Sequence, residues 1–276
     1  MQRRFQQVDV FTSIPYAGNP VAVVLDGDGL TAEQMQRVAR WTNLSETTFV
    51  CRPTHADADY LLRIFNPANE MAFAGHPTLG SAHALLRQGI VPKRQGTLVQ
   101  QCGVGLVHLK CDDKGIRIAL PIAQFTPIDD AACRLLEQAL GTELLHAPQI
   151  VDLGVKWLTG QVASGALLRG LHPDMDRMLA LTQRLGSGVN IFGLDGEVAE
   201  VRSFAPHEGT PEDPVCGSGN GAVAYYLRQQ RGCIDYTARQ GRCIGRDGYI
   251  DIAYGQDGTI WLGGQAVTCI DGSITL

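Results

Sequence analysis

An internal repeat constrains this chain more than any other feature of its sequence. Glu70–Leu86 (EMAFAGHPTLGSAHALL) is echoed by Glu212–Leu227 (EDPVCGSGNGAVAYYL), and upstream Arg63–Pro67 (RIFNP) reads like Arg202–Pro206 (RSFAP). In each copy an extended segment leads through an acidic residue to a small-residue turn and a helix start, where backbone N–H groups lack helical partners. The repeat therefore predicts two related halves that close on a shared cleft, with one site built from both turns.

The expected elements predict an α+β protein in which each half is rich in strands and has a helix beside its turn. Residues 1–121 form the first expected domain, residues 122–264 form the second, and a last strand within 265–276 is expected to return to the first. Asn19 is expected at the tip of the first hairpin. Helices are expected from Thr31 to near Trp41 and over Leu79–Gln88, Asp129–Leu140, Pro173–Leu185 and Asn220–Gln230.

Charge and hydropathy argue against large anionic partners. The net charge is −5, and Lys and Arg are scattered without a basic run, so neither nucleic acid nor a membrane surface is an expected partner. No apolar run reaches the roughly 18–20 residues that span a bilayer. The N-terminus lacks the apolar core and cleavage site of a signal peptide. The sequence therefore predicts a soluble cytoplasmic protein.

The eight cysteines are dispersed, with no Cys-x-x-Cys pair and no His at zinc-ligand spacing. No metal site is predicted. Seven of the cysteines are expected to be small buried hydrophobic residues. Cys216 differs from them because it lies in the second turn.

Acidic, imidazole and hydroxyl side chains gather around the two turns. Glu46 stands at the mouth of an expected strand, His76 lies in the first turn, and Asp213, Cys216 and Ser218 lie in or beside the second. A carboxyl group beside a partly dry cleft can have its pKa raised toward neutrality, and a neutral His can give or take a proton. This set of residues predicts proton transfer that requires neither a metal nor a nucleotide.

The backbone of both turns suits an anionic ligand. Helix N-termini bind a carboxylate or stabilise an enolate through their N–H groups and dipoles. Glycines at the turns let a ligand approach the backbone closely; they are Gly75, Gly217 and Gly219.

Each candidate also has a structural interpretation. Glu46 could cap an element or face solvent, and His76 could hydrogen-bond its own turn. Asp213 could be a turn former, and Ser218 could cap its helix. The run Gly217–Ala222 also fits the loose dinucleotide fingerprint G-x-G-x-x-A. No apolar strand precedes that run and no βαβ unit follows it, so a nucleotide site is not predicted.

With these residues identified, the whole chain resembles the PhzF family of phenazine-biosynthesis-type isomerases, which are relatives of diaminopimelate epimerase and proline racemase. The resemblance rests on several separated motifs in the right order. They are Val8–Thr12 (VDVFT) with Gly18-Asn19-Pro20, Leu44–Phe49 (LSETTF), Ile64–Pro67 (IFNP) with Glu70, Phe73–Pro77 (FAGHP), and Glu212–Val215 (EDPV) with Gly217-Ser218.

The resemblance implies a diaminopimelate epimerase-like fold of two pseudo-symmetric domains, each a barrel-like β-sheet around a central helix. It further implies an active site between the domains, no cofactor, and a homodimer. The general acid/base Glu of the family corresponds to Glu46, and its site His and Asp correspond to His76 and Asp213. Residues expected to bind substrate are Asn19, Gly75, Cys216, Gly217, Ser218 and Gly219.

Three functions follow as hypotheses. The first is a cofactor-independent isomerase, as in a biosynthetic pathway, in which Glu46 moves a proton on a small carboxylate-bearing substrate. The second is an epimerase or racemase of an amino-acid-like compound that uses Cys216 with Glu46 or His76. The epimerase relatives have a Cys in each half, whereas the partner position here is Ala74, which excludes a two-thiol mechanism. The third is a small-molecule binding protein without turnover.

Overall fold

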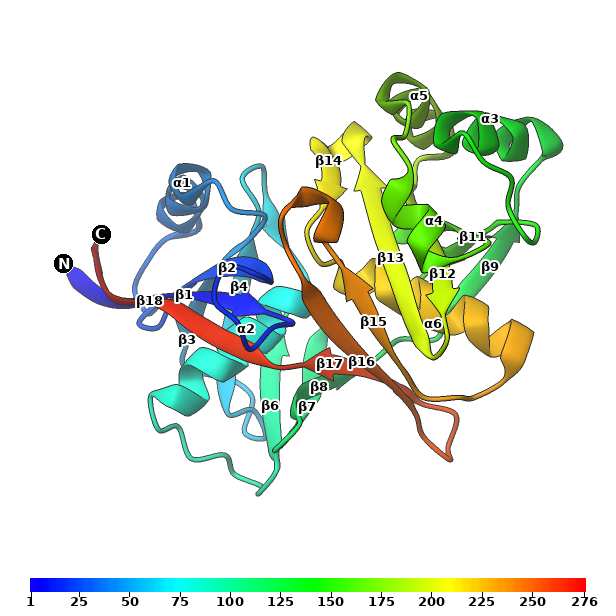
Figure 1. Ribbon diagram of the computed structural model, residues 1–276. Helices are drawn as coiled ribbons and strands as arrows, with labels where there is room; N and C mark the ends of the chain where they lie inside the picture. The colour runs from blue at the N-terminus through cyan, green and yellow to red at the C-terminus, as the bar shows by residue number, and fades with distance from the viewer. The chain divides into compact units, whose positions relative to one another are not determined.

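The computed structural model describes residues 1–276, which divide into two compact units. Unit 1 comprises Met1–Ala119 and Gly263–Leu276, and unit 2 comprises Leu120–Leu262. Each unit is built from β-strands around one central helix (Figure 1), so the α+β class predicted from the sequence is confirmed. None of the helices combines the length and the apolar content needed to cross a membrane.

The strands of unit 1 are β1 (Gln2–Val10), β2 (Asn19–Val24), β3 (Thr47–Cys51), β4 (Tyr60–Phe65), β5 (Glu70–Met71), β6 (Thr97–Cys102), β7 (Gly105–Asp112), β8 (Gly115–Ala119) and β18 (Ala266–Thr275). β1 pairs antiparallel with β2 on one side and with β18 on the other. The pairs β2–β3 and β4–β6 are parallel, and the pairs β3–β4, β6–β7 and β7–β8 are antiparallel. Asn19 pairs with Val10 at the start of β2, so it lies in a strand and not at a hairpin tip.

The two chain ends lie side by side in unit 1. Gln2 pairs with Thr275 at the outer end of the β1–β18 ladder. Beyond it, the Leu276 N–H donates to the Met1 carbonyl at 3.0 Å, and the amino group of Met1 donates to the Leu276 carbonyl.

The central helix of unit 1 is α2 (Gly75–Arg87). Nine of its 13 residues are buried, and it packs against β1, β2, β3, β4, β8 and β18 (Figure 1). A Cβ atom on Gly80 would lie 2.4 Å from Cγ1 of Val21, so only glycine permits this approach to β2. α1 (Ala32–Thr42) begins with the capping box of Thr31 and Gln34, which fixes its start.

The strands of unit 2 are β9 (Gln124–Pro127), β10 (Gln149–Asp152), β11 (Lys156–Val162), β12 (Gly188–Asp195), β13 (Val198–Ala205), β14 (Thr210–Asp213), β15 (Tyr236–Gln240) and β16 (Gly248–Tyr254), and β17 (Ile260–Gly264) leads back into unit 1. The pairs β11–β12 and β13–β15 are parallel. The pairs β9–β10, β10–β11, β12–β13, β13–β14 and β15–β16 are antiparallel.

The central helix of unit 2 is α6 (Gly217–Arg231). Ten of its 15 residues are buried, and it packs against β10, β11, β12 and β16. The outer helices are α3 (Asp130–Leu140), α4 (Gly165–Gly170) and α5 (Met175–Leu185), and the 3₁₀ turns are η1 (Pro206–Glu208) and η2 (Arg242–Ile244). α3 and α5 lie side by side (Figure 1) and share a core with β11 and β12.

Both central helices begin earlier than the sequence pattern predicts. α2 begins at Gly75 instead of Leu79, and α6 begins at Gly217 instead of Asn220. Both helix starts were missed because Gly and Pro in or beside the first turns have low helix propensity. Pro77 is tolerated there because a first-turn N–H has no helical acceptor. The two repeated turns are therefore themselves the first turns of the central helices. The short helix α4 was not predicted.

Candidate active site

Glu46 and His76 form a buried pair in unit 1. Glu46 directly precedes β3, and its carbonyl accepts a hydrogen bond from the Ala22 N–H of β2 at 3.3 Å. His76 is the second residue of α2. Oε2 of Glu46 lies 3.2 Å from Nε2 of His76, and the side chains are 14% and 9% exposed. The parallel β2–β3 pair and the central helix thus bring together two of the predicted site residues.

The His76 ring is held in its neutral form. Burial lowers the pKa of His76 to about 4, although a hydrogen bond to the Pro20 backbone opposes this shift. Because a buried imidazole loses its hydration, the charged form is disfavoured near pH 7. A neutral imidazole against a carboxyl group can donate or accept a single proton.

Asn19 and Gly75 lie at the starts of the elements that carry this pair. Asn19 is fully buried in β2. Gly75 is the first residue of α2, and the N-cap residue Ala74 has no side-chain acceptor for the amides that follow it. The first turn of α2 is therefore not capped by its own N-cap residue, unlike that of α6.

In unit 2, Asp213 is the last residue of β14. Burial raises the pKa of Asp213 to about 7, and a hydrogen bond from the Val215 N–H to Oδ1 at 3.0 Å partly opposes the shift. A carboxyl group that titrates near pH 7 can both release and accept a proton under ordinary conditions. The bond from Val215 is the contact of a turn former, so the catalytic role of Asp213 stays a prediction.

Cys216 is the N-cap residue of α6. Its Sγ accepts a hydrogen bond from the Gly219 N–H at 3.2 Å. Ser218, which could have been the cap, is instead the second helical residue, and its Oγ accepts from the indole N–H of Trp157 at 3.0 Å. The small size of Gly219 is used in packing, because a Cβ atom there would lie 2.8 Å from Oγ of Ser203.

The Cys216 thiol is poorly suited to act as a base. Burial, and next the negative charge of Asp213, raise its pKa well above the ordinary value. Hydrogen bonds from Ser218 and Gly219 favour the thiolate but do not compensate. The neutral thiol therefore caps the helix, which weighs against the epimerase hypothesis.

A buried polar network behind the α6 turn was not predicted. Asn190, Ser203, Asn220 and Gln240 are each at most 1% exposed and are linked by hydrogen bonds. Asn190 Nδ2 also donates to the Gly219 carbonyl at 2.6 Å. The sequence did contain an indication of this network: a polar residue at an inward-facing position of a strand whose other inward-facing residues are apolar.

The repeat also preserves an Arg–Glu clamp in each unit. Arg63 makes two hydrogen bonds to Glu70, both 2.7 Å, and Arg202 makes two to Glu212, at 2.9 and 2.8 Å. Each guanidinium also lies over the ring of the phenylalanine two residues later, at 5.2 Å in unit 1 and 5.1 Å in unit 2. Each clamp secures the short strand that leads into the repeated turn.

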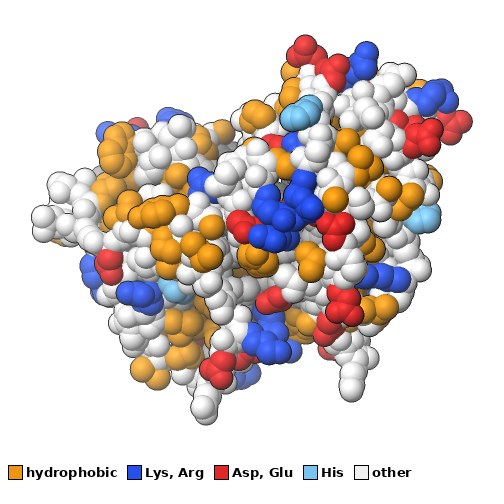
Figure 2. Space-filling model, viewed as in Figure 1, with side chains coloured by type: hydrophobic (Ala, Val, Ile, Leu, Met, Phe, Trp, Pro, Cys, Tyr) orange, Lys and Arg blue, Asp and Glu red, His pale blue; other side chains and the backbone are white.

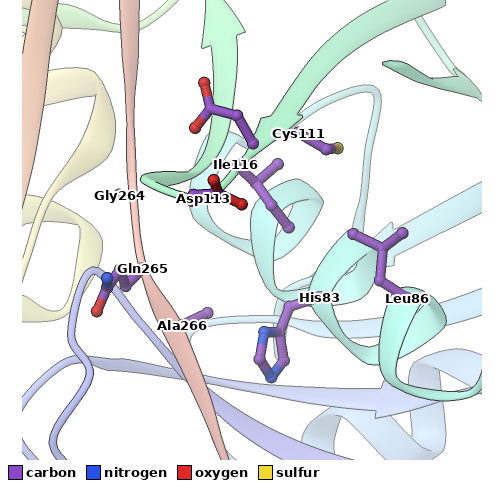
Figure 3. Close-up of a pocket in the computed structure, with 10 residues that line it drawn as sticks. His83, Leu86, Cys111, Asp113, Ile116, Gly264, Gln265 and Ala266 are labelled. Carbon is purple, nitrogen blue, oxygen red and sulfur yellow. The ribbon is translucent and has the colours of Figure 1, made fainter. Parts of the chain in front are cut away.

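A cavity within unit 1 does not contain the predicted residues. It has a volume of about 460 Å³ and lies between α2, the β7–β8 turn and the start of β18 (Figure 3). Its lining includes His83, Cys111 and Asp113. His83 Nε2 is already 3.1 Å from Oγ1 of Thr268. The chemistry of the Glu46–His76 pair is a stronger indication of function than this cavity.

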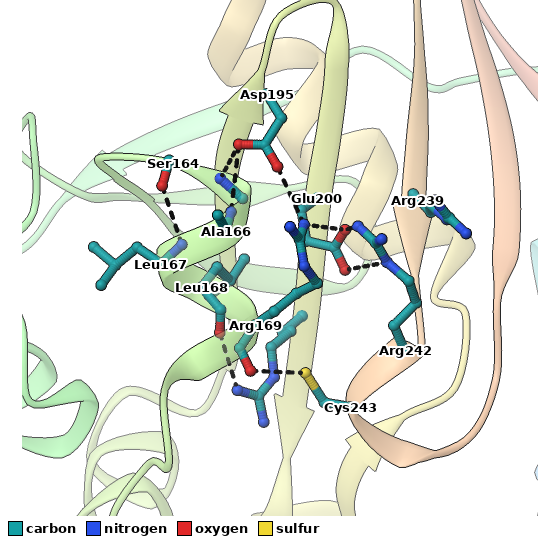
Figure 4. Close-up of polar contacts among 12 residues, drawn as sticks. Ser164, Ala166, Leu167, Leu168, Arg169, Asp195, Glu200, Arg239, Arg242 and Cys243 are labelled. Atoms are coloured by element: carbon teal, nitrogen blue, oxygen red, sulfur yellow. Dashed lines mark hydrogen bonds and ion pairs between the residues drawn. The ribbon is translucent and has the colours of Figure 1, made fainter.

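Surface charges are locally neutralised. On the face seen in Figure 2, groups of basic side chains lie beside acidic ones. In unit 2, Arg169 contacts both Asp195 and Glu200, at 3.1 and 3.3 Å, and Arg242 also pairs with Glu200 (Figure 4). Such alternation explains how the chain can carry several neighbouring arginines without forming a basic patch.

Thiol labelling tests the role assigned to Cys216. The prediction that the other seven cysteines are buried is wrong for Cys233 and Cys243, which are exposed. We expect iodoacetamide at pH 8 to modify these two well before Cys216, because the Cys216 thiol is buried and protonated. Peptide mass spectrometry over time would follow each site. Modification of Cys216 as fast as Cys243 would contradict the assignment.

The Asp213→Asn variant tests the environment of Asp213. A carboxyl pKa above its unfolded value means that the folded state binds more protons, so its contribution to stability is lost as pH rises from about 4 to 7. The amide avoids this loss. We expect the variant to be more stable than wild type at pH 8 by on the order of 4 kcal/mol, and equal to it near pH 4. Urea unfolding at both pH values would measure the difference; equal gains at both would contradict it.

Comparisons with known proteins agree with this architecture. A family model described as phenazine biosynthesis-like protein (PhzC-PhzF) matches residues 8–272. Antisense-enhancing sequence 1 of Schizosaccharomyces pombe is 38% identical over 290 residues, with 98% of each chain covered. A trans-2,3-dihydro-3-hydroxyanthranilate isomerase of Pseudomonas chlororaphis is 37% identical over 246 residues, with 87% of this chain and 86% of the isomerase covered. A solved PhzF family protein of Bacillus anthracis matches over 100% of both chains with a TM-score of 0.86 at 24% identity.

Proposed function

Because this chain belongs to the PhzF family of phenazine biosynthesis-like isomerases, we propose that it moves a proton on a small carboxylate-bearing substrate, with Glu46 as general acid and base. The observation that supports this most is the buried contact between Glu46 and His76. Two groups able to exchange one proton lie 3.2 Å apart, away from bulk water. A protein that only binds its ligand would have little use for such a pair.

In this proposal the two carboxyl oxygens of Glu46 have different roles. Oε2 of Glu46 faces Nε2 of His76, so Oε1 is the oxygen proposed to meet the substrate. The neutral ring donates its one proton to the Pro20 backbone, so Nε2 is a proton acceptor on the Glu46 side. A C–H bond of the substrate breaks, its proton passes to Oε1, and the electron pair delocalises through the adjacent unsaturated system. Glu46 then gives a proton to another carbon, and because a carboxyl proton exchanges with solvent, deuterium from D₂O can enter at that carbon. No net oxidation or reduction occurs, and no cofactor takes part.

The predicted residues of unit 2 suit a second proton carrier and an anion site. Asp213, with its pKa near 7, orients the substrate and can exchange a proton with one of its polar groups. The first-turn amides of α6, together with the Ser218 hydroxyl, hold the substrate carboxylate. Ser218 accepts from Trp157, and its own hydrogen, which can point to Sγ of Cys216 at 3.5 Å, would turn to the anion when substrate binds.

The substrate of the Pseudomonas chlororaphis relative is the first compound to test. We expect the protein to isomerise trans-2,3-dihydro-3-hydroxyanthranilate in D₂O, with NMR recording the loss of one C–H signal and the entry of deuterium at another carbon. If this compound is inert, a panel of small unsaturated carboxylates should be screened for deuterium exchange at carbon. Ligands that bind tightly across the panel without any exchange would contradict the proposal and favour a binding protein.

A further inference from the structure

We propose that Gln240 is a positioning residue that holds Asp213 and the first turn of α6 in their working arrangement. The inference rests on the proposed function, because it assumes that both of these groups act on the substrate. Gln240 itself lies behind the turn, is 1% exposed, and has no part in the chemistry.

All the hydrogen-bonding capacity of the Gln240 amide is used within unit 2. Its Oε1 accepts from the Cys216 N–H at 3.1 Å and from Nδ2 of Asn220 at 2.7 Å. Its Nε2 donates to the Asp213 carbonyl at 3.0 Å and to Oγ of Ser203 at 3.2 Å. A primary amide offers two donors and two acceptor positions, so these four bonds fix both its position and the plane of its amide group.

Two of the four bonds join the two ends of one turn. The Asp213 carbonyl and the Cys216 N–H stand on either side of Pro214 and Val215, and one planar amide holds both. The bond to Asn220 extends this hold into the second turn of α6. A shift of Gln240 would therefore move Asp213 and the helix N-terminus together.

The repeat supplies an internal comparison. The residue after Gln240 is Gly241, where a Cβ atom would lie 2.5 Å from the Pro214 carbonyl oxygen. In unit 1, a Cβ atom on Gly103 would likewise lie 2.7 Å from Cα of Ala72, the residue equivalent to Pro214 in the repeat. The position equivalent to Gln240 is thus Cys102.

Cys102 and Gln240 occupy equivalent positions but differ in their capacity for hydrogen bonds. Cys102 is a small buried side chain that cannot make four hydrogen bonds. The strand position therefore does not itself require an amide. Gln240 occurs only in the copy whose turn carries Asp213. In unit 1 a different amide of the equivalent strand, that of the buried Gln100, donates to Oγ1 of Thr78 in α2 at 3.0 Å and does not join the two ends of the turn.

The test measures Asp213 directly, without relying on turnover. In protein labelled with ¹³C at Asp carboxyl carbons, Asp213→Asn identifies the Asp213 signal, which should titrate near pH 7 in wild type. In Gln240→Met the turn should relax toward water, so we expect the midpoint to fall by at least about one pH unit. Gln240→Asn, which keeps an amide that is too short to reach all four partners, should shift it in the same direction. It also provides a second variant if Gln240→Met does not fold.

Cys102→Ala is the matched control, since it alters the equivalent buried position in unit 1. It should leave the Asp213 midpoint unchanged. An unchanged midpoint in the folded Gln240 variants would overturn the proposal, as would an equal shift in Cys102→Ala. On any substrate found, the Gln240 variants should lose about 10- to 100-fold in kcat and show a displaced pH profile. A shifted midpoint in a protein that turns over no compound would refute the proposed function while leaving the positioning role intact.

Discussion

Glu46→Gln should retain substrate binding and lose turnover. The amide keeps the size of the side chain and can still contact Nε2 of His76, but it cannot take a proton from carbon. We expect kcat to fall by about 10²- to 10⁴-fold with little change in KM, because general acid–base catalysis contributes a factor of that order. Steady-state kinetics on a substrate found by the D₂O screen would measure both constants.

Glu33→Gln provides the control, since it makes the same chemical change on the exposed first turn of α1. It should leave both constants unchanged. If Glu46→Gln isomerised the same substrate at the wild-type rate, Glu46 would not be the general base, whatever the reaction proved to be.

The second large effect concerns stability and uses the repeated clamp. Arg202 and Glu212 are only 7% and 11% exposed. Arg202→Met leaves the Glu212 carboxylate buried without its guanidinium partner, and it also removes the donor to the Leu171 carbonyl at 2.8 Å. We expect a loss of about 3–5 kcal/mol in the free energy of unfolding, as for other buried ion pairs that lose one member. Urea unfolding monitored by circular dichroism would measure it.

The equivalent substitution in unit 1 is the matched comparison. Arg63 and Glu70 have nearly the same geometry but are 26% and 41% exposed, so water can solvate the remaining carboxylate. Arg63→Met should therefore lower stability by only about 1 kcal/mol or less. Adding Glu212→Gln to Arg202→Met should restore part of the loss. Equal effects of Arg63→Met and Arg202→Met would show that burial does not decide the strength of this clamp.

Local sequence signals predicted the outer helices better than the central ones. The start of α1 at its Thr31 cap and the limits of α3, from the Asp129 cap to Gly141, were confirmed because short-range caps determine them. α2 and α6 begin within glycine- and proline-containing turns of low helix propensity. Packing against strands from much of each unit overrides that propensity.

The repeat made part of the candidate site predictable from the sequence. The repeat led to His76, Asp213 and the α6 turn, but nothing local in the sequence links Glu46 to His76. That contact depends on the parallel pairing of β2 with β3. Trp157 and Gln240 were missed because each reaches the turn from a distant strand. In a strand such as Tyr236–Gln240, where buried and half-buried positions alternate, a polar residue at a buried position indicates that its side chain makes structural hydrogen bonds.

Because Met1 and Leu276 are adjacent, the elements of this chain could be connected in a second, circularly permuted order. Unit 2 interrupts unit 1 in sequence, whereas the free ends of unit 1 already exchange backbone hydrogen bonds. A short linker between these ends, with a new opening between Ala119 and Leu120, would make both units continuous and place them in tandem. In such a circular permutant each half could be expressed, labelled or exchanged as one uninterrupted segment, and the ancestry suggested by the repeat would be restored as an ordinary head-to-tail duplication.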